Sequence, residues 1–180
     1  MVLTTKYNSP IGELLLTSKD GKLIGLWIEK QKYFLGDIKE EMQENAEEPI
    51  LIKTKKWLDK YFNGEKPQIS DLDINLEYTG SEFTQNVWKL LCDIPYGEVV
   101  TYGELAKKVA KKMNKSKMSA QAVGGAVGHN PIGIIVPCHR VVGANGSLTG
   151  YAGGIDKKIK LLELENVGTK NGVVKFNWLL

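Results

Sequence analysis

The sequence predicts a mixed α/β (α+β) protein with two domains, residues 1–79 and residues 80–180. The first part combines a β-hairpin with an amphipathic helix, which is typical of a small α/β unit. After Gly80 the chain changes to short capped helices and loops, which predicts a mostly helical second domain. A chain of 180 residues is long enough for two such domains to bury separate cores.

The elements of the first domain follow from turn residues and from the spacing of apolar residues. Asp20-Gly21 separates two apolar runs, 14–16 and 23–28, and predicts a β-hairpin. The segment 29–48 is charged and weakly periodic, so we expect a loop with a polar helix. The next helix is predicted by residues at helical spacing, namely Ile50, Thr54, Trp57, Leu58 and Tyr61. A final strand is predicted by the alternation of Ile74, Leu76 and Tyr78.

The helices of the second domain are predicted from capping residues. Ser81 precedes an apolar stripe and is expected to cap the first of these helices. Thr101 and Glu104 have the spacing of a capping box, which opens the next helix. Ser119 and Asp156 are expected to cap two further helices, the second of which is the last in the chain.

The second domain carries an uneven charge. From Leu105 to Ile155 there is no Asp or Glu. The cations of this segment are Lys107, Lys108, Lys111, Lys112, Lys115, Lys117 and Arg140. An acid-free basic segment favours nucleic acid as a partner over an ordinary solvated face, because carboxylates would repel phosphates. Two short helices on either side of a lysine-rich connection then predict a helix-turn-helix. The second helix offers only Gln121 as a long polar side chain, so we expect binding that is independent of base sequence.

Composition argues against several other classes of protein. No apolar stretch approaches the roughly 18 residues that span a bilayer, so no membrane segment is expected. The N-terminus has no basic start followed by an apolar region, so we expect a cytoplasmic protein without a signal peptide. Cys92 and Cys138 are then expected to be free thiols, with Cys92 buried inside a helix. Two Cys and two His without paired spacing predict no metal site.

Pro137-Cys138-His139-Arg140 concentrates scarce residues in one loop. It contains one of the two cysteines, one of the two histidines and the only arginine of the chain. A thiolate is a strong nucleophile and an adjacent imidazole or cation lowers its pKa, so this loop is the candidate for covalent chemistry. A buried cysteine beside a surface histidine is the alternative interpretation. The apolar run 132–136 is expected to hold the loop from a buried base.

The motifs around this loop resemble the O6-alkylguanine-DNA alkyltransferase family, whose members are methylated-DNA–protein-cysteine methyltransferases. They are Phe83-Thr84-Gln85-Asn86-Val87-Trp88, Ile94-Pro95-Tyr96-Gly97-Glu98, Thr101-Tyr102-Gly103, Asn130-Pro131, Pro137–Gly143 and Leu148–Gly154. The resemblance implies a ribonuclease-H-like N-terminal domain and a winged-helix-like C-terminal domain with a helix-turn-helix. It also implies a DNA repair protein that flips O6-alkylguanine out of duplex DNA and transfers the alkyl group irreversibly to its own cysteine. One turnover, no cofactor and no metal are implied, and O4-alkylthymine stays open as a second substrate.

The resemblance assigns roles to residues of this chain. Cys138 would be the acceptor thiolate, His139 would deprotonate it through a water, and Glu165 would hold and polarise the imidazole. Asn130 would brace the turn before the active-site loop, and Tyr102 would contact phosphate and donate a hydrogen bond to the guanine. The base pocket would be formed by Tyr151, Val141, Ala152 and Val127. DNA contacts are expected from Gln121, Ala122, Lys107, Lys111, Lys115 and Lys117. We expect a monomer whose partner is double-stranded DNA that contains alkylated guanine.

Two features depart from the family pattern. Gln121 stands where many relatives have an arginine that fills the gap left by the flipped base, so Gln121 as the intercalating residue is a hypothesis. The connection 111–118 between the two helices is also longer than in those relatives.

Arg140 is interpreted as a structural anchor. Without the resemblance, Glu165 reads as an exposed helix carboxylate and Tyr102 as a core-edge aromatic.

Two other functions stay open from the residues. A non-catalytic protein of the same fold could bind alkylated bases and flag them for other repair machinery, although the presence of Cys138 argues against it. A thiol hydrolase is the other alternative. In such enzymes cysteine and histidine usually meet only through the fold, whereas Cys138 and His139 are adjacent in the sequence.

Overall fold

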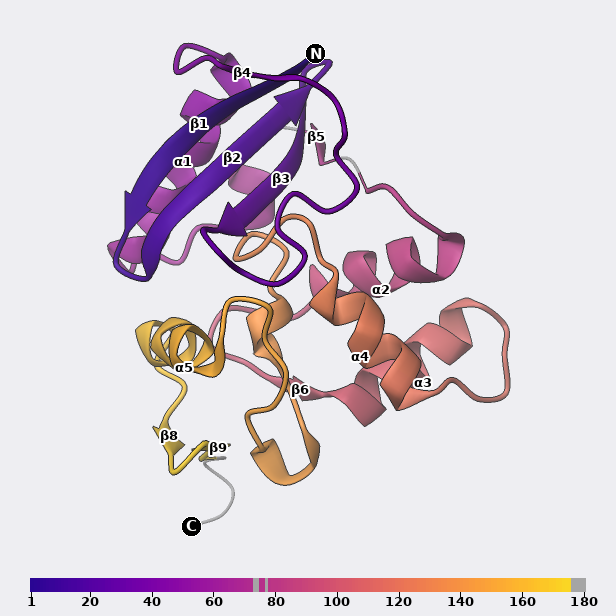
Figure 1. Ribbon diagram of the computed structural model, residues 1–180. Helices are drawn as coiled ribbons and strands as arrows, with labels where there is room; N and C mark the ends of the chain where they lie inside the picture. Colours follow the sequence, from indigo (N-terminus) through magenta and orange to yellow (C-terminus); the bar gives the residue numbers. More distant parts are fainter. Residues whose placement is uncertain (73–74, 77, 176–180) are drawn as a thin grey trace. The chain divides into compact units, whose positions relative to one another are not determined.

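The computed structural model describes residues 1–72, 75–76 and 78–175. Backbone contacts divide the chain into two compact units. The first consists of Met1–Tyr78 together with Pro131–Ile135, and the second of Thr79–Asn130 together with Val136–Leu180. The first unit is built on a β-sheet and the second mainly on helices, so the predicted fold class is confirmed (Figure 1).

The sheet of the first unit is an antiparallel meander with a short parallel strand at each edge. Strands β1 (Val2–Ser9), β2 (Gly12–Lys19) and β3 (Lys22–Ile28) pair in sequence, and the full order is β4-β1-β2-β3-β5. The edge strands are β4 (Met42–Glu44) and β5 (Asn75–Leu76). The meander is visible as the indigo and violet arrows in Figure 1.

The hairpin prediction is confirmed at the turn between β2 and β3. Asp20 and Gly21 have φ values of 49° and 73°, which is the left-handed backbone that a two-residue turn needs to match the twist of its strands. Leu14 and Leu23 are fully buried between more exposed neighbours, and Leu16 is fully buried as well. Strand β1 was not predicted, because its sequence carries neither a turn signal nor regular alternation.

One helix, α1 (Pro49–Phe62), packs against the meander. Thr54, Trp57, Leu58 and Tyr61 lie on its buried face as predicted, together with Leu51 rather than Ile50. The rings of Trp57 and Tyr61 stack with their centroids 5.5 Å apart. A short 3-10 helix, η1 (Ile69–Leu72), follows. Of the strand predicted near residues 74–78, β5 is observed, and Ile74 lies outside the described residues.

The polar helix expected within residues 29–48 is wrong. This segment consists of turns that lead into β4. Lys30, Tyr33 and Leu35 have φ values of 64°, 57° and 65°, and left-handed residues of this kind interrupt a right-handed helix. The absence of an apolar stripe means that no burial offsets the cost of ordering a helix here.

The segment Pro131–Ile135 belongs to the first unit although it lies late in the chain. The backbone N–H of Leu26 donates to the carbonyl of Pro131 at 2.8 Å, and that of Gly133 donates to the carbonyl of Leu26 at 3.0 Å. Ile132 is fully buried. The expectation that this apolar run is a buried base is confirmed.

The second unit begins with helices whose N-caps are the predicted residues. Ser81 caps α2 (Glu82–Leu91) by accepting from the N–H of Thr84, and Ser119 caps α4 (Ala120–Gly128) by accepting from the N–H of Ala122. Between them, strand β6 (Val100–Thr101) leads into α3 (Tyr102–Lys112). Both hydrogen bonds of the capping box formed by Thr101 and Glu104 are present. Helices α2, α3 and α4 contact one another pairwise.

Two predicted details of the helix ends are wrong. Cys92 does not lie inside α2 but is its C-cap, and it is half-buried because the chain turns away after Leu91. The last helix, α5 (Ile155–Leu164), is capped not by Asp156 but by Gly154, whose φ of 98° suits only glycine. Asp156 lies in the first turn, where its charge favours the helix dipole.

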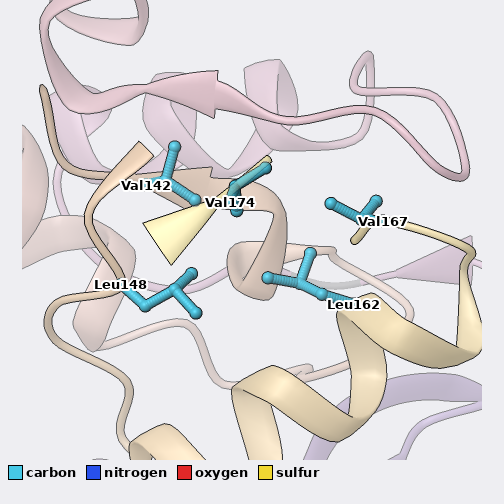
Figure 2. Packing of buried hydrophobic residues seen from close by; sticks show 5 residues of the cluster. All are labelled: Val142, Leu148, Leu162, Val167 and Val174. Atoms are coloured by element: carbon cyan, nitrogen blue, oxygen red, sulfur yellow. The ribbon is translucent and has the colours of Figure 1, made fainter. Parts of the chain in front are cut away.

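The rest of the second unit surrounds the reactive tetrapeptide. A 3-10 turn, η2 (Cys138–Arg140), continues into β7 (Val141–Val142), which pairs with β6. After η3 (Ala144–Gly146) and α5, the antiparallel strands β8 (Thr169–Lys170) and β9 (Val173–Val174) follow. A small core formed by Val142, Leu148, Leu162, Val167 and Val174 holds β7, α5 and β9 together, and Figure 2 shows Leu162 reaching from α5 toward Leu148. None of the helices in the described ranges has the length and apolar character that crossing a membrane would need.

Candidate active site

Cys138 opens the 3-10 turn η2, and its backbone is held on both sides. Its N–H donates to the carbonyl of Val136 at 2.8 Å, and the N–H of Val141 donates to the carbonyl of Cys138. Cys138 is 9% exposed, whereas the next residue, His139, is not exposed at all. The turn therefore fixes the thiol at the edge of the interior while it directs the imidazole inward.

His139 is bound to a buried carboxylate. Its Nε2 lies 2.6 Å from Oε1 of Glu165, which is the C-cap of α5 and is 2% exposed. Burial lowers the pKa of His139, and the charge of Glu165 only partly opposes this effect. The imidazole is therefore neutral at neutral pH. Since the carboxylate accepts, Nε2 carries the proton and the lone pair of the neutral ring lies on Nδ1.

Glu165 is held by further donors that keep it ionised. Arg140 donates from Nε to Oε2 at 2.9 Å and from Nη2 to Oε1 at 3.1 Å, and the N–H of Gly97 donates to Oε2 at 3.2 Å. Burial alone would raise the pKa of Glu165, but hydrogen bonds from His139 and Arg140 and the charge of Arg140 hold it well below the usual value. Such a carboxylate can orient the imidazole and stabilise its protonated form.

Arg140 connects this network to the surrounding fold. Its Nη1 donates to the carbonyl of Ile94 at 2.6 Å, and its guanidinium lies 5.8 Å from the ring centroid of Tyr96. The hydroxyl of Tyr96 donates to the carbonyl of Leu164 at 3.0 Å, next to Glu165. These contacts match the role of a structural anchor, because all of them bind residues of the protein interior.

Asn130 links the end of α4 to the reactive turn. It is buried, and its Nδ2 donates to the carbonyl of Val136 at 2.8 Å. Burial raises the pKa of the Cys138 thiol, while hydrogen bonding from Asn130 and the charge of Lys158 act in the opposite direction. Asn130 therefore holds the backbone before the turn in place and favours ionisation of the Cys138 thiol.

Two tyrosines of the second unit remain neutral hydrogen-bond donors. The hydroxyl of Tyr102, at the start of α3, lies 3.3 Å from the carbonyls of both Thr149 and Gly150. Burial raises the pKa of Tyr102 to about 12. Burial also raises the pKa of Tyr151 well above its usual value. At neutral pH both phenols can donate a proton in a hydrogen bond but carry no charge.

The other residues assigned to the base pocket lie near the same turns. The carbonyl of Val141 accepts from Lys158, and Ala152 is half-buried in the loop before α5. Val127 faces the interior from α4, and its carbonyl accepts from the N–H of Asn130 at 3.3 Å. Val127 can therefore contact a base only from within the packed side of α4.

The residues assigned to DNA contacts are exposed. Lys107 and Lys111 lie on α3, and Gln121 and Ala122 lie in the first turn of α4. Lys115 and Lys117 lie in the connection between the two helices and are also exposed. The indole Nε1 of Trp88 on α2 donates to the carbonyl of Ala126 at 2.8 Å, which fixes α4 from its inner side. The exposed lysines thus lie on α3 and on the connection that leads into the anchored helix α4.

Lys158 is a site residue that was not predicted from the sequence. It lies on the buried face of α5 with Leu161 and Leu162, and it is fully buried. Its Nζ donates to the carbonyls of Val141 and Thr149 at 2.5 Å and 3.2 Å. The sequence pattern that could have indicated its burial is that Lys158 lies three and four residues before Leu161 and Leu162, so it falls within the apolar stripe of the helix. Among the described residues, no cluster of His, Cys, Asp or Glu has the arrangement of a metal site.

Two family models match the chain. The model described as "6-O-methylguanine DNA methyltransferase, ribonuclease-like domain" covers residues 2–76. The model described as "6-O-methylguanine DNA methyltransferase, DNA binding domain" covers residues 82–167, which include Cys138, His139 and Glu165.

Similar proteins match over most of their length. The methylated-DNA–protein-cysteine methyltransferase of Haemophilus influenzae is 39% identical over 177 residues, which cover 96% of this chain and 93% of the relative. The protein of the same name from Methanosarcina acetivorans is 42% identical over 159 residues, 88% of this chain and 95% of the relative. The crystal structure of Mycobacterium tuberculosis OGT in complex with DNA has a TM-score of 0.80 at 41% identity, and the match covers 91% of this chain and 93% of that one.

Proposed function

Because the chain belongs to the family of 6-O-methylguanine DNA methyltransferases, the methylated-DNA–protein-cysteine methyltransferases, we propose that Cys138 is the cysteine that accepts the alkyl group. The activity of this family is DNA repair by transfer of a methyl group from methylated DNA to a protein cysteine, and it is the activity of this chain. One observation carries the assignment of Cys138. It is held at the start of a turn whose next residue, His139, is bound to the buried carboxylate of Glu165.

The reaction is a transfer between oxygen and sulfur. The thiolate of Cys138 attacks the alkyl carbon that is bonded to O6 of guanine. The carbon–oxygen bond breaks, its electron pair stays on the guanine, and the guanine takes up a proton. A carbon–sulfur bond forms in its place. The product is a thioether, and because nothing in the mechanism regenerates the thiol, each molecule reacts once. The thiolate takes the alkyl group directly from the guanine, so the transfer needs no cofactor.

The thiolate is generated by the neighbouring imidazole. Neutral His139 has its lone pair on Nδ1, and it takes the proton of Cys138 through a water. The carboxylate of Glu165 stabilises the imidazolium that forms, as the third member of a nucleophile, base and orienting group. Because the pKa of His139 is lowered by burial, the base is in its active neutral form at neutral pH.

The substrate is an alkylated guanine that leaves the base stack. A thiolate held inside the protein cannot reach the alkyl carbon on O6 while the guanine is stacked in the duplex, so the nucleotide is flipped out before the reaction. Tyr151 supplies an aromatic wall for the base, and Tyr102 donates a hydrogen bond to it as charge develops. Main-chain groups of Val141 and Ala152 contact the base edges, with Val127 behind them.

Double-stranded DNA is bound by the basic surface of α3 and the following connection, together with the first turn of α4. The side chains concerned are Lys107, Lys111, Lys115, Lys117, Gln121 and Ala122, all of which are exposed. Lysines that contact phosphates bind any sequence, which suits a protein that must find rare lesions. Gln121, in the first turn of α4, fills the place of the flipped nucleotide. The protein acts as a monomer inside the cell, where a reducing environment keeps Cys138 a free thiol.

Intact mass measurement tests this assignment directly. The protein is incubated with duplex DNA that contains O6-methylguanine, and its mass is followed against Cys138→Ala. The expected result is a gain of one methyl group that peptide mapping assigns to Cys138, and no gain in the variant despite retained DNA binding. Methylation of Cys92 instead, or tight binding of the lesion without a mass change, contradicts the assignment. The second outcome describes a lesion-flagging protein.

A further inference from the structure

Lys158 is a buried cation at the border of the reactive turn. It is fully buried in α5, and its Nζ donates to the carbonyl of Val141 at 2.5 Å and to that of Thr149 at 3.2 Å. It also lies 5.9 Å from the ring centroid of Tyr102. Val141 in turn donates its N–H to the carbonyl of Cys138. The lysine is therefore two hydrogen bonds away from the backbone of Cys138.

The charge of Lys158 has no carboxylate partner among residues 1–72, 75–76 and 78–175, since its contacts are two carbonyls and an aromatic ring. A buried ammonium group without a counter-ion is costly, and protein interiors seldom tolerate one. The charge that favours the ammonium form is the thiolate of Cys138, and the ammonium favours the thiolate in return.

The other ionisable groups around Lys158 are already engaged. The neutral imidazole of His139 and the guanidinium of Arg140, both in η2, are bound to Glu165 at the end of α5, so the charge of Arg140 is balanced by that carboxylate. Tyr102 of α3 stays neutral, because burial raises its pKa to about 12. The groups near Lys158 whose charges change during the reaction are thus the imidazole of His139, which is paired with Glu165, and the thiol of Cys138.

We propose that Lys158 is a positioning residue for alkyl transfer, whose buried ammonium group stabilises the thiolate of Cys138 and fixes the carbonyls of Val141 and Thr149 beside the reactive turn. The proposal rests on the assignment of Cys138 as the alkyl acceptor. It deepens that assignment, since His139 removes the proton from sulfur and Lys158 favours the charge that remains. When the sulfur becomes a thioether, the ammonium group loses this partner.

Burial lowers the pKa of Lys158 to about 8, and the nearby thiolate acts against this shift. Lys158 is therefore largely protonated at neutral pH. In Lys158→Met the side chain keeps its length and apolar stem but loses its charge. The thiol of Cys138 should then ionise at higher pH, and the transfer rate at neutral pH should fall about tenfold for each unit by which the thiol pKa rises.

The test uses the full chain in a Cys92→Ser background, so that Cys138 is the one thiol that is measured. Serine can keep the hydrogen bond that Cys92 makes to the carbonyl of Trp88. Ionisation of Cys138 is followed by the ultraviolet absorbance of the thiolate as a function of pH, without DNA. Single-turnover transfer from duplex DNA with O6-methylguanine is measured over the same pH range. The variants are Lys158→Met, the charge-retaining Lys158→Arg and, as the matched control on the exposed face of α5, Lys160→Met.

We expect the titration of Cys138 and the rising limb of the rate profile to move to higher pH together in Lys158→Met. The rates of Lys158→Met and the parent protein should converge at high pH, where the thiol ionises without help. Lys158→Arg should restore part of the shift, and Lys160→Met should change neither measurement. An unchanged thiol titration in Lys158→Met, or a rate lowered by one factor at every pH, overturns the proposal.

A second measurement keeps the proposal testable if Lys158→Met does not fold. The ammonium group of Lys158 is titrated by nitrogen NMR in the protein before and after methylation of Cys138. Loss of the thiolate should lower the pKa of Lys158, and an unchanged pKa contradicts the proposal. If the parent protein takes up no methyl group at all, the assigned function fails, while the thiolate titration still decides the role of Lys158.

Discussion

Nε2 of His139 lies 2.6 Å from Oε1 of Glu165 in the interior of the second unit, and both residues are almost completely buried. Both carboxylate oxygens of Glu165 also accept from Arg140. One carboxylate therefore balances a permanent cation and a group that becomes a cation during the reaction.

Replacing Glu165 by Gln should impair both folding stability and transfer. The substitution leaves the guanidinium of Arg140 buried without its counter-ion, which typically costs about 3–5 kcal/mol of the free energy of unfolding. It also removes the charge that stabilises the imidazolium of His139, so the transfer rate should fall on the order of a hundredfold. Denaturant unfolding and single-turnover kinetics measure the two effects. Glu163→Gln, an exposed change on the same helix, is the control; equal behaviour of the two variants would contradict the role of Glu165.

Lys158 should make the folded state more stable as the solution becomes alkaline. Its pKa is about 8 in the folded protein and near 10.5 in the unfolded chain, so the unfolded chain binds more protons between these values. Stability therefore rises with pH across this window, by up to about 3 kcal/mol, and the full penalty is present below pH 8. Chemical unfolding of the parent protein and of Lys158→Met at several pH values measures the rise. As a control, the difference in stability between two uncharged variants, Lys158→Met and Lys158→Leu, should not change with pH. A parallel pH dependence of the parent protein and Lys158→Met would show that the lysine is not the cause.

Local signals account for the elements that the sequence predicted correctly. The caps at Ser81, Thr101 and Ser119 and the turn at Asp20-Gly21 depend on side chains within three residues, so they can be read directly. The edge strand β4 depends on a partner far away in the chain, which explains why it was not predicted. The cap of α5 was assigned to Asp156 because a carboxylate is a common N-cap, whereas the N-cap in the structure is Gly154, whose φ is positive.

The site divides in the same way. Cys138 and His139 were recognisable because scarce reactive residues are adjacent in the sequence. The contact of His139 with Glu165 spans 26 residues, and only resemblance to a family connected the two beforehand. Lys158 was missed because a lysine in a helix is usually solvated, and its burial depends on the carbonyl of Val141 in β7 and that of Thr149 in the following loop.

Removing basic side chains from the surface of α3 and the following connection should weaken DNA binding without regard to sequence. In the combined variant Lys107→Ala, Lys111→Ala and Lys115→Ala, each lost phosphate contact should reduce the slope of log affinity against log salt by about 0.9. Fluorescence anisotropy at several salt concentrations measures the slope on lesion-containing and undamaged duplexes. The control removes the lysines on the exposed side of α1, Lys53, Lys56 and Lys60. A salt slope that stays the same in the first variant, or falls equally in the control, removes the argument for this surface.

Gln121 should matter only when a base must be flipped out of a duplex. It lies exposed in the first turn of α4 and can fill the vacated stack or hydrogen-bond the orphaned partner base, but it brings no charge. A hydrogen bond of this kind contributes about 1 kcal/mol, so Gln121→Ala should slow transfer from duplex DNA roughly fivefold. Transfer from a single strand with the same O6-methylguanine leaves no vacated stack, and its rate should be unchanged. Gln121→Arg should instead speed transfer from the duplex, because it adds attraction to the phosphates. A loss that is equal on single and double strands would assign Gln121 to general DNA binding rather than to flipping.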